Sequence, residues 1–120
     1  MVRVEMKGVR IMSDHFYPTD GTKTLKKLRD LKPDTFKAFV EFDKKAFEEG
    51  ALNVKTKELI AIAVGHVTQC PYCIDVHTKK AIAAGATEQE VAESIFVAIA
   101  LRAGGSFAHS SIAMHAMEHK

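Results

Sequence analysis

Signals that start α-helices recur along most of this 120-residue chain, and they restrict its fold more than any other feature. Asparagine and threonine favour the N-cap position, and proline favours the first helical turn. Each signal stands before a segment whose apolar residues recur at helical spacing. The signals are Pro33, Asn53, the pair Cys70-Pro71 and the capping-box pattern Thr87-x-x-Glu90. They predict helices over residues 34–49, 54–68, 71–84 and from 88 onward.

Glycines and a leucine pattern complete the expected fold. Gly50 and Gly85 are predicted to end two of the helices, because glycine favours the left-handed conformation that follows a helix. A shorter helix is predicted over 22–31, residues 1–20 are expected to be an N-terminal arm, and Gly104-Gly105 is expected to break or kink the last helix. No β-rich core is indicated, so we expect a single all-α domain. Its packing residues are expected to include Phe36, Phe39, Phe42 and Phe47.

The composition excludes several classes of protein. Lys and Arg number 17 against 15 Asp and Glu, and they are spread along the chain, whereas a nucleic-acid-binding face needs clustered basic residues. The most apolar run, Ile95–Leu101, has seven residues, but a membrane-spanning helix needs roughly 20. The charged N-terminus lacks the apolar segment of a signal peptide. We therefore expect a cytoplasmic protein that binds neither nucleic acid nor membrane.

The last third of the chain is unusually poor in charge. Between Ser94 and Met117 the only formally charged residue is Arg102. A helix on the surface of a monomer needs a polar face, and this segment is apolar or small nearly all round. A fully wrapped central helix would also explain the pattern, but a chain of this size has little material with which to wrap it. We therefore expect a homo-oligomer in which this segment is covered by another subunit.

The two cysteines form the motif Cys70-Pro71-Tyr72-Cys73. With Pro71 in the first helical turn, Cys70 is the expected N-cap and Cys73 a first-turn residue, where unpaired N–H groups and the helix dipole favour a thiolate. His77 follows Cys73 by four residues and therefore shares its helix face. An imidazole beside a thiol is typical of a nucleophile and its base. The two sulfurs are also close enough to form a disulfide once one is oxidised.

Two other interpretations of the cysteines remain open. Free cysteines are often buried and unreactive. Cys70, Cys73 and His77 are also three ligands of the type that zinc prefers, and a structural zinc site needs a fourth. The candidates for that fourth ligand are His66, His109 and Glu58.

A carboxylate, Glu58, stands at the start of an apolar segment, and eleven residues separate it from Cys70 of the cysteine motif. With this spacing, and with the surrounding segments 55–61 and 83–90, the chain resembles the AhpD-like, carboxymuconolactone decarboxylase family. The resemblance covers residues 34–117. It implies an AhpD-like helical bundle with that segment as its core, assembled as a trimer or a hexamer.

The resemblance also implies a role for each residue of the motif. Glu58 and His77 would form a proton relay. Cys73 would be the attacking thiolate, and Cys70 would resolve the resulting sulfenic acid to a disulfide. Tyr72 departs from the peroxidase members, in which a histidine commonly precedes the second cysteine, so the relay would be shorter here.

The expected function is that of a thiol–disulfide oxidoreductase or alkyl hydroperoxide reductase. The oxidant would be a hydroperoxide or the disulfide of a partner. No flavin, haem or nicotinamide motif is present, so electrons would return through a partner protein or a small dithiol, with no cofactor or metal. Two alternatives are a decarboxylase or isomerase acting on a small lactone acid, and a non-catalytic oligomer whose cysteines bind metal or sense oxidation.

Overall fold

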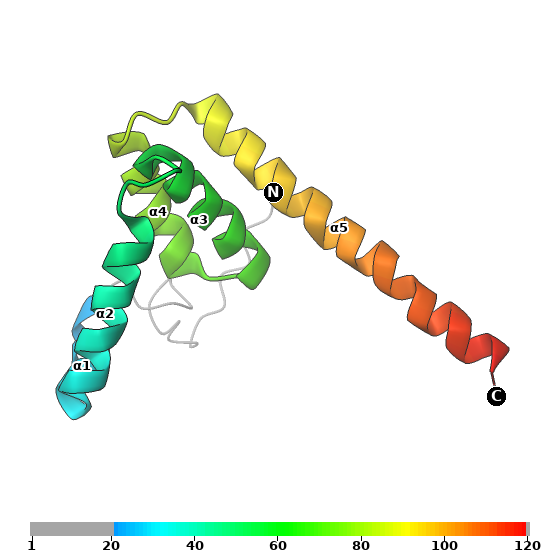
Figure 1. The fold of residues 1–120 in the computed structure, drawn as a ribbon, viewed down its shortest axis with the longest axis horizontal. Helices are drawn as coiled ribbons and strands as arrows, with labels where there is room; N and C mark the ends of the chain where they lie inside the picture. The colour runs from blue at the N-terminus through cyan, green and yellow to red at the C-terminus, as the bar shows by residue number, and fades with distance from the viewer. Residues whose placement is uncertain (1–20, 120) are drawn as a thin grey trace, which may run out of the picture. The chain divides into compact units, whose positions relative to one another are not determined.

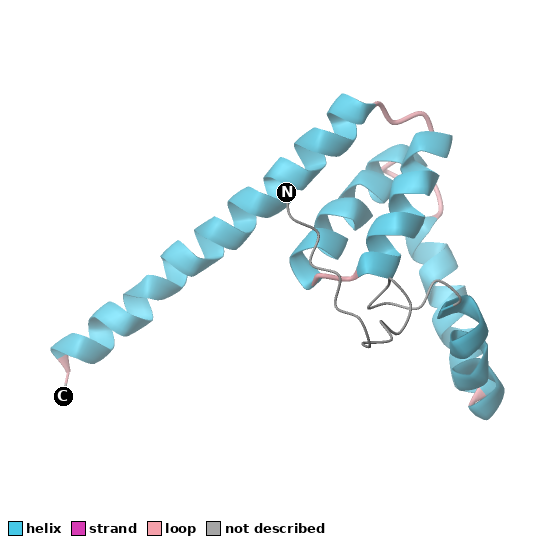
Figure 2. Ribbon diagram, turned by 180° about the vertical axis from the view of Figure 1, so that it is seen from behind, coloured by secondary structure: helices cyan, strands magenta, loops and turns pink. Residues whose placement is uncertain are grey.

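A computed structural model describes residues 21–119, which form five helices joined by short loops (Figure 1, Figure 2). The helices are α1 (Gly21–Leu31), α2 (Pro33–Phe47), α3 (Val54–Thr68), α4 (Pro71–Ala83) and α5 (Glu88–Glu118). The predicted all-α class is confirmed, because the described range contains no strand. The expected arm at residues 1–20 lies outside the described residues.

Contacts divide the chain into two compact units, Met1–Phe42 and Asp43–Lys120. The boundary falls inside α2, so the last turn of that helix belongs with α3, α4 and α5. All residues of the candidate site lie in the second unit. The expectation of one domain for the whole chain stays a prediction.

The predicted cap residues start α3 and α5. The side-chain oxygen of Asn53 accepts a hydrogen bond from the Thr56 amide at 2.8 Å. At the start of α5 the Thr87 hydroxyl accepts from the Glu90 amide at 3.1 Å, and the Glu90 carboxylate accepts from the Thr87 amide at 3.0 Å. This reciprocal pair completes the capping box. Gly85 follows α4 with a φ of 94°, which glycine adopts without strain.

Two expectations about α2 are wrong. The helix ends at Phe47, two residues before the predicted end, where the carbonyls of Ala46 and Glu48 accept hydrogen bonds from the side chain of Lys57. The predicted packing role is also wrong for Phe39 and Phe42, which are exposed, whereas Phe36 and Phe47 are half-buried and no residue of α2 is fully buried. Helical spacing identified the apolar face of α2 but could not show whether another element covers it.

The expected break in the last helix is also wrong, because α5 runs without interruption through Gly104 and Gly105. Glycine keeps its backbone donor and acceptor, and it costs only about 1 kcal/mol relative to alanine inside a helix. With 31 residues, α5 is long and apolar enough to cross a bilayer by length and composition alone. The expectation that no segment reaches that length is therefore wrong, since it counted only the run Ile95–Leu101 and not the whole weakly charged helix.

The buried centre of the second unit is small and lies around α3, which contacts both α4 and α5. It is built from apolar side chains of α3, α4, α5 and the loop before α5: Leu59, Ile62, Ala81, Ala86, Val91 and Ile95. Only the first turns of α5 contribute to this centre, and residues 106–119 are exposed. α3 is therefore the central helix of this unit.

Candidate active site

The turn between α3 and α4 places both cysteines at the start of a helix. α3 ends at Gln69, whose φ of 56° is left-handed. The Cys70 amide then donates a hydrogen bond to the Gly65 carbonyl at 2.9 Å, and Pro71 opens α4. This tight reversal lets α4 pack against α3. The predicted start of α4 at the pair Cys70-Pro71 is confirmed.

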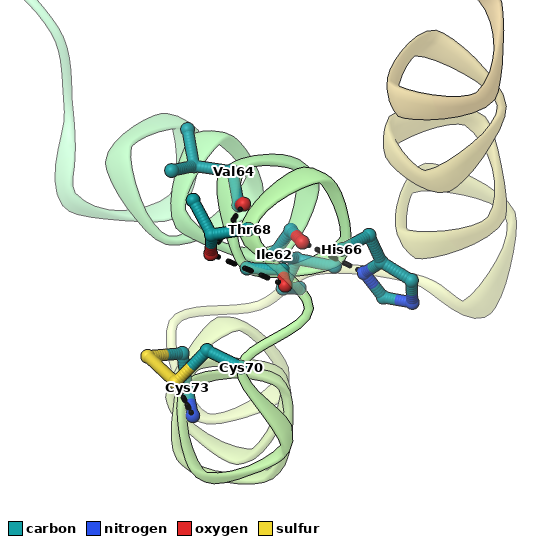
Figure 3. Close-up of a disulfide and its surroundings, with 7 residues drawn as sticks. Ile62, Val64, His66, Thr68, Cys70 and Cys73 are labelled. Carbon is teal, nitrogen blue, oxygen red and sulfur yellow. Dashed lines mark hydrogen bonds between the residues drawn. A yellow bond between two sulfur atoms is a disulfide. The ribbon is translucent and has the colours of Figure 1, made fainter. Parts of the chain in front are cut away.

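Cys70 and Cys73 form a disulfide within the first turn of α4 (Figure 3). Cys70 is the N-cap, as predicted, and its sulfur accepts a hydrogen bond from the Cys73 amide at 3.3 Å. The two α-carbons are 5.3 Å apart, within the ordinary range for a disulfide. The first turn of α4 therefore brings the two cysteines within bonding distance.

The helices α3 and α4 lie close together at Gly65. A β-carbon added at Gly65 would lie 3.3 Å from the β-carbon of Cys73 and 3.5 Å from a side-chain carbon of Ile74. The Thr68 hydroxyl donates to the Val64 carbonyl at 3.0 Å on the same turn (Figure 3). The end of α3 therefore fits closely against the start of α4, and only glycine leaves this spacing undisturbed.

Glu58 and His77 meet across the interface of α3 and α4. The Oε2 atom of Glu58 lies 2.6 Å from Nδ1 of His77, although the residues are 19 positions apart. Glu58 is only 3% exposed, and a buried carboxylate requires a hydrogen-bond donor. A carboxylate can only accept, so we assign the Nδ1 hydrogen of His77 to this bond, and in that tautomer Nε2 can accept a proton.

Two residues that the sequence patterns did not connect with the site also contact it. The ring of Phe47 stacks on the imidazole of His77, with a centroid distance of 4.9 Å and an interplanar angle of 11°. Lys57, the neighbour of Glu58, reaches the end of α2 and donates to the Ala46 carbonyl at 2.9 Å. Nothing in the sequence near Phe47 signals this contact. For Lys57, the one indication in the sequence that it lies near the site was its position next to Glu58.

An apolar cavity of about 410 Å³ lies beside the disulfide and the imidazole. Cys73 and His77 both form part of its wall, so the two residues border one space. Most of the remaining wall is apolar and includes Phe47, Leu52, Ile60 and Val64. A molecule with an apolar group could therefore present a polar reacting atom to Cys73.

The described residues do not bring together the four ligands that a structural zinc site would need. Within residues 21–119 no group of three or more His, Cys, Asp and Glu side chains is placed to hold a metal ion. Nδ1 of His66 lies 2.7 Å from the Ile62 carbonyl, and the ring points away from the disulfide (Figure 3). His109 bonds to the Gly105 carbonyl on α5. Neither histidine is the fourth ligand that the zinc interpretation requires.

The all-α fold and the Cys70–Cys73 disulfide at the start of α4 together define a class of helical protein. The chain belongs to the carboxymuconolactone decarboxylase family, whose family model matches residues 33–116. It is 47% identical over 81 residues to uncharacterized protein 4 in the cox locus of Paracoccus denitrificans, which covers 68% of this chain and 73% of that protein.

Solved structures agree with this assignment. A carboxymuconolactone decarboxylase family protein from Legionella pneumophila superimposes with a TM-score of 0.66 at 35% identity, covering 82% of this chain and 88% of that one. A family protein from Thermotoga maritima, described with a possible involvement in antioxidative response, superimposes with a TM-score of 0.52 at 28% identity. That match covers 68% of this chain and 93% of the other.

Proposed function

We propose that this protein is an oxidoreductase that cycles Cys70 and Cys73 between dithiol and disulfide, with Glu58 and His77 moving the protons. The observation that carries the proposal is the Glu58–His77 contact of 2.6 Å beside a bonded cysteine pair. Family membership supports an enzymatic or redox role, and the description of the Thermotoga maritima relative supports an antioxidative one.

The first half-reaction oxidises Cys73. Its thiolate attacks an oxygen of the hydroperoxide R–O–OH, so that an S–O bond forms while the O–O bond breaks. Cys73 becomes a sulfenic acid and the peroxide is reduced to the alcohol R–OH. Nε2 of His77 takes the thiol proton and returns it to the leaving alkoxide, while Glu58 holds Nδ1–H and stabilises the imidazolium.

The second half-reaction closes the disulfide. The Cys70 thiol attacks the sulfenic sulfur, an S–S bond forms, and the hydroxyl leaves with a proton as water. The dithiol has then passed two electrons to the peroxide. A partner protein or a small dithiol restores the reduced pair by thiol–disulfide exchange and is itself oxidised. The same exchange, run in reverse, would reduce the disulfide of a partner.

The cavity supports an organic hydroperoxide as the oxidant. Its wall is mostly apolar, and each buried methylene group contributes about 0.8 kcal/mol to binding. Hydrogen peroxide has no apolar group and gains nothing from such a wall. An alkyl hydroperoxide can place its chain in the cavity and its peroxide oxygens beside Cys73.

The proposal includes self-association in the cytoplasm, as a trimer or hexamer by the family resemblance. α5 carries large apolar side chains that are exposed in the described part of the chain, among them Phe96, Phe107, Ile112 and Met117, and Phe107 is 81% exposed. Such a surface on a soluble chain favours a partner subunit. A bilayer is the competing environment for α5, and the oligomer measurement in the Discussion separates the two.

The proposed function is tested by titrating the thiols of the reduced protein before and after one equivalent of cumene hydroperoxide or hydrogen peroxide. We expect both thiols to be lost together, and faster with cumene hydroperoxide. A parallel metal analysis should find no stoichiometric zinc. Retention of both thiols would exclude the redox cycle. Decarboxylation of a lactone acid by the Cys70→Ser/Cys73→Ser protein would favour the lactone-acid alternative.

A further inference from the structure

We infer that Lys57 and Phe47 are positioning residues that fix the orientation of the His77 imidazole, an inference that rests on the proposed thiol chemistry. Lys57 binds the end of α2, and the end of α2 holds the Phe47 ring against His77. Both residues also line the cavity beside Cys73 and His77, and the role that we infer for them is exerted through the His77 ring.

The side chain of Lys57 fastens the last turn of α2 to α3. Its ammonium group donates to the Ala46 carbonyl at 2.9 Å and to the Glu48 carbonyl. The last carbonyls of a helix lack intrahelical partners and carry the negative end of the helix dipole, so they favour a cation. The two bonded carbonyls belong to the residues on either side of Phe47. Lys57 thus holds the backbone of Phe47 from both sides.

Phe47 supplies a restraint on His77 that Glu58 cannot supply. A single hydrogen bond from Nδ1 to Glu58 fixes one atom of the imidazole, and the ring can still tilt about that bond. The stacked Phe47 ring, with an interplanar angle of 11°, opposes this tilt because it covers one face of the imidazole. The two contacts together determine where Nε2 points.

The direction of Nε2 matters because His77 and Cys73 share the wall of one cavity. A proton moves between them only at hydrogen-bond distance, directly or through one water molecule. A small displacement of a catalytic group can lower a rate up to about a hundredfold. Residues that hold the imidazole plane therefore affect the rate without taking part in a chemical step.

Lys55 provides a matched control on the same helix. It lies two residues before Lys57, and its ammonium group forms a 3.0 Å ion pair with Glu90 of α5. Lys55→Met removes one lysine and one tertiary contact of α3, as Lys57→Met does. Its contact lies with α5 and not with the end of α2, so a general loss of stability at α3 would affect both variants.

The experiment compares Lys57→Met, Phe47→Leu, their double variant, Lys57→Arg and Lys55→Met. In a Cys70→Ser background, the alkylation rate of Cys73 is measured against pH. Long-range ¹H–¹⁵N NMR of the His77 ring and ring contacts between Phe47 and His77 are recorded on the same proteins. These NMR signals do not depend on peroxide turnover, so they test the positioning even if the redox cycle fails.

We expect Lys57→Met and Phe47→Leu to slow alkylation at neutral pH by at least about threefold and to alter its pH profile in the same way. The double variant should be no slower than the slower single variant, because both changes remove one restraint. Lys57→Arg should retain the wild-type profile, and Lys55→Met should too. In Lys57→Met the Phe47–His77 ring contacts should be lost.

Three results would overturn the inference. The first is unchanged His77 ring signals in Lys57→Met. The second is equal slowing by Lys55→Met and Lys57→Met, and the third is full additivity in the double variant. If Lys57→Met does not fold, Phe47→Leu decides alone: wild-type alkylation and wild-type His77 signals in that variant would refute the positioning role.

Discussion

A methyl group added to Gly65 would lie 3.3 Å from the β-carbon of Cys73, so these two residues set the distance between α3 and α4. Gly104 is the matched comparison, since an added β-carbon there meets nothing within 4 Å. Alanine is favoured over glycine inside a helix by about 1 kcal/mol. We expect Gly104→Ala to raise the free energy of unfolding by up to that amount, and Gly65→Ala to gain less or to lose stability.

Gly65→Val should lower the free energy of unfolding by about 1–3 kcal/mol, the usual range for overpacking. Denaturant unfolding of the three variants with reduced cysteines measures these differences. An equal increase in the free energy of unfolding for Gly65→Ala and Gly104→Ala would mean that α4 can move away from α3 without cost.

Glu58→Gln tests the carboxylate directly. Glutamine keeps the size of Glu58 and can still accept the hydrogen bond from Nδ1 of His77, but it lacks the negative charge that stabilises an imidazolium. General acid–base assistance contributes about 10²–10⁴-fold, so alkylation of Cys73 near neutral pH should slow at least tenfold. The alkylation rate of wild type, Glu58→Gln and His77→Ala is measured against pH. Coincident curves for all three would show that no relay operates.

Cys70→Ser and Cys73→Ser separate the roles of the two sulfurs. Serine is a preferred N-cap residue, so Cys70→Ser should keep the start of α4. With peroxide, this variant should carry a sulfenic acid on Cys73 or a disulfide between chains, detected by dimedone labelling and mass spectrometry. Cys73→Ser should leave Cys70 largely reduced. Faster labelling of Cys70 than of Cys73 would reverse the assignment of the attacking sulfur.

The ion pair between Lys55 of α3 and Glu90 of α5 should make the stability of the fold depend on pH. The hydrogen bond that Glu90 accepts from Lys55, followed by that from the Thr87 amide, holds the pKa of its carboxyl below the usual 4.5. The folded chain therefore binds this proton less tightly than the unfolded chain. The stabilisation is complete above about pH 4.5 and is lost as the pH falls through the lowered pKa.

Glu90→Gln should accordingly be less stable than wild type at about pH 7, and the difference should shrink at about pH 3. Urea unfolding at the two pH values measures this difference in the free energy of unfolding. A difference that is the same at both would mean that the charge of Glu90 contributes nothing.

The exposed apolar side chains of α5 predict an assembly larger than the 13.2 kDa monomer. Light scattering after size exclusion, without detergent, should give a multiple of that mass, and Phe107→Lys should shift the distribution toward the monomer. Ser110→Lys, at a polar position of the same helix, is the control. A monomeric wild type would refute self-association, and partition into phospholipid vesicles would place α5 in a bilayer.

Local signals in the sequence predicted the local parts of this structure. The caps at Asn53 and Thr87 depend on contacts within four residues, so residue type and spacing were enough to find them. The Glu58–His77 contact spans 19 positions and was expected only through the family resemblance. The Phe47–His77 stacking spans 30 positions and has no local signature, because it arises from how Lys57 fastens α2.

The failed expectations have a common physical origin. The glycine pair at 104–105 weakens a helix by an amount that neighbouring turns can offset, so propensity alone did not determine where α5 ends. The phenylalanines of α2 follow the spacing of a buried face, yet Phe39 and Phe42 are exposed. In both cases the outcome depends on what the rest of the chain or a partner places alongside the helix.

The disulfide joins two residues only three positions apart, inside a single turn of α4. A covalent link between distant segments restricts the unfolded chain strongly, whereas a loop this short restricts it little. We therefore expect the packing of α3, α4 and α5 to persist when the bond is broken, because the link lies inside a single turn of α4. In the proposed cycle the tertiary structure would then be the same in both oxidation states, so a change in the redox environment would not shorten the lifetime of the folded protein.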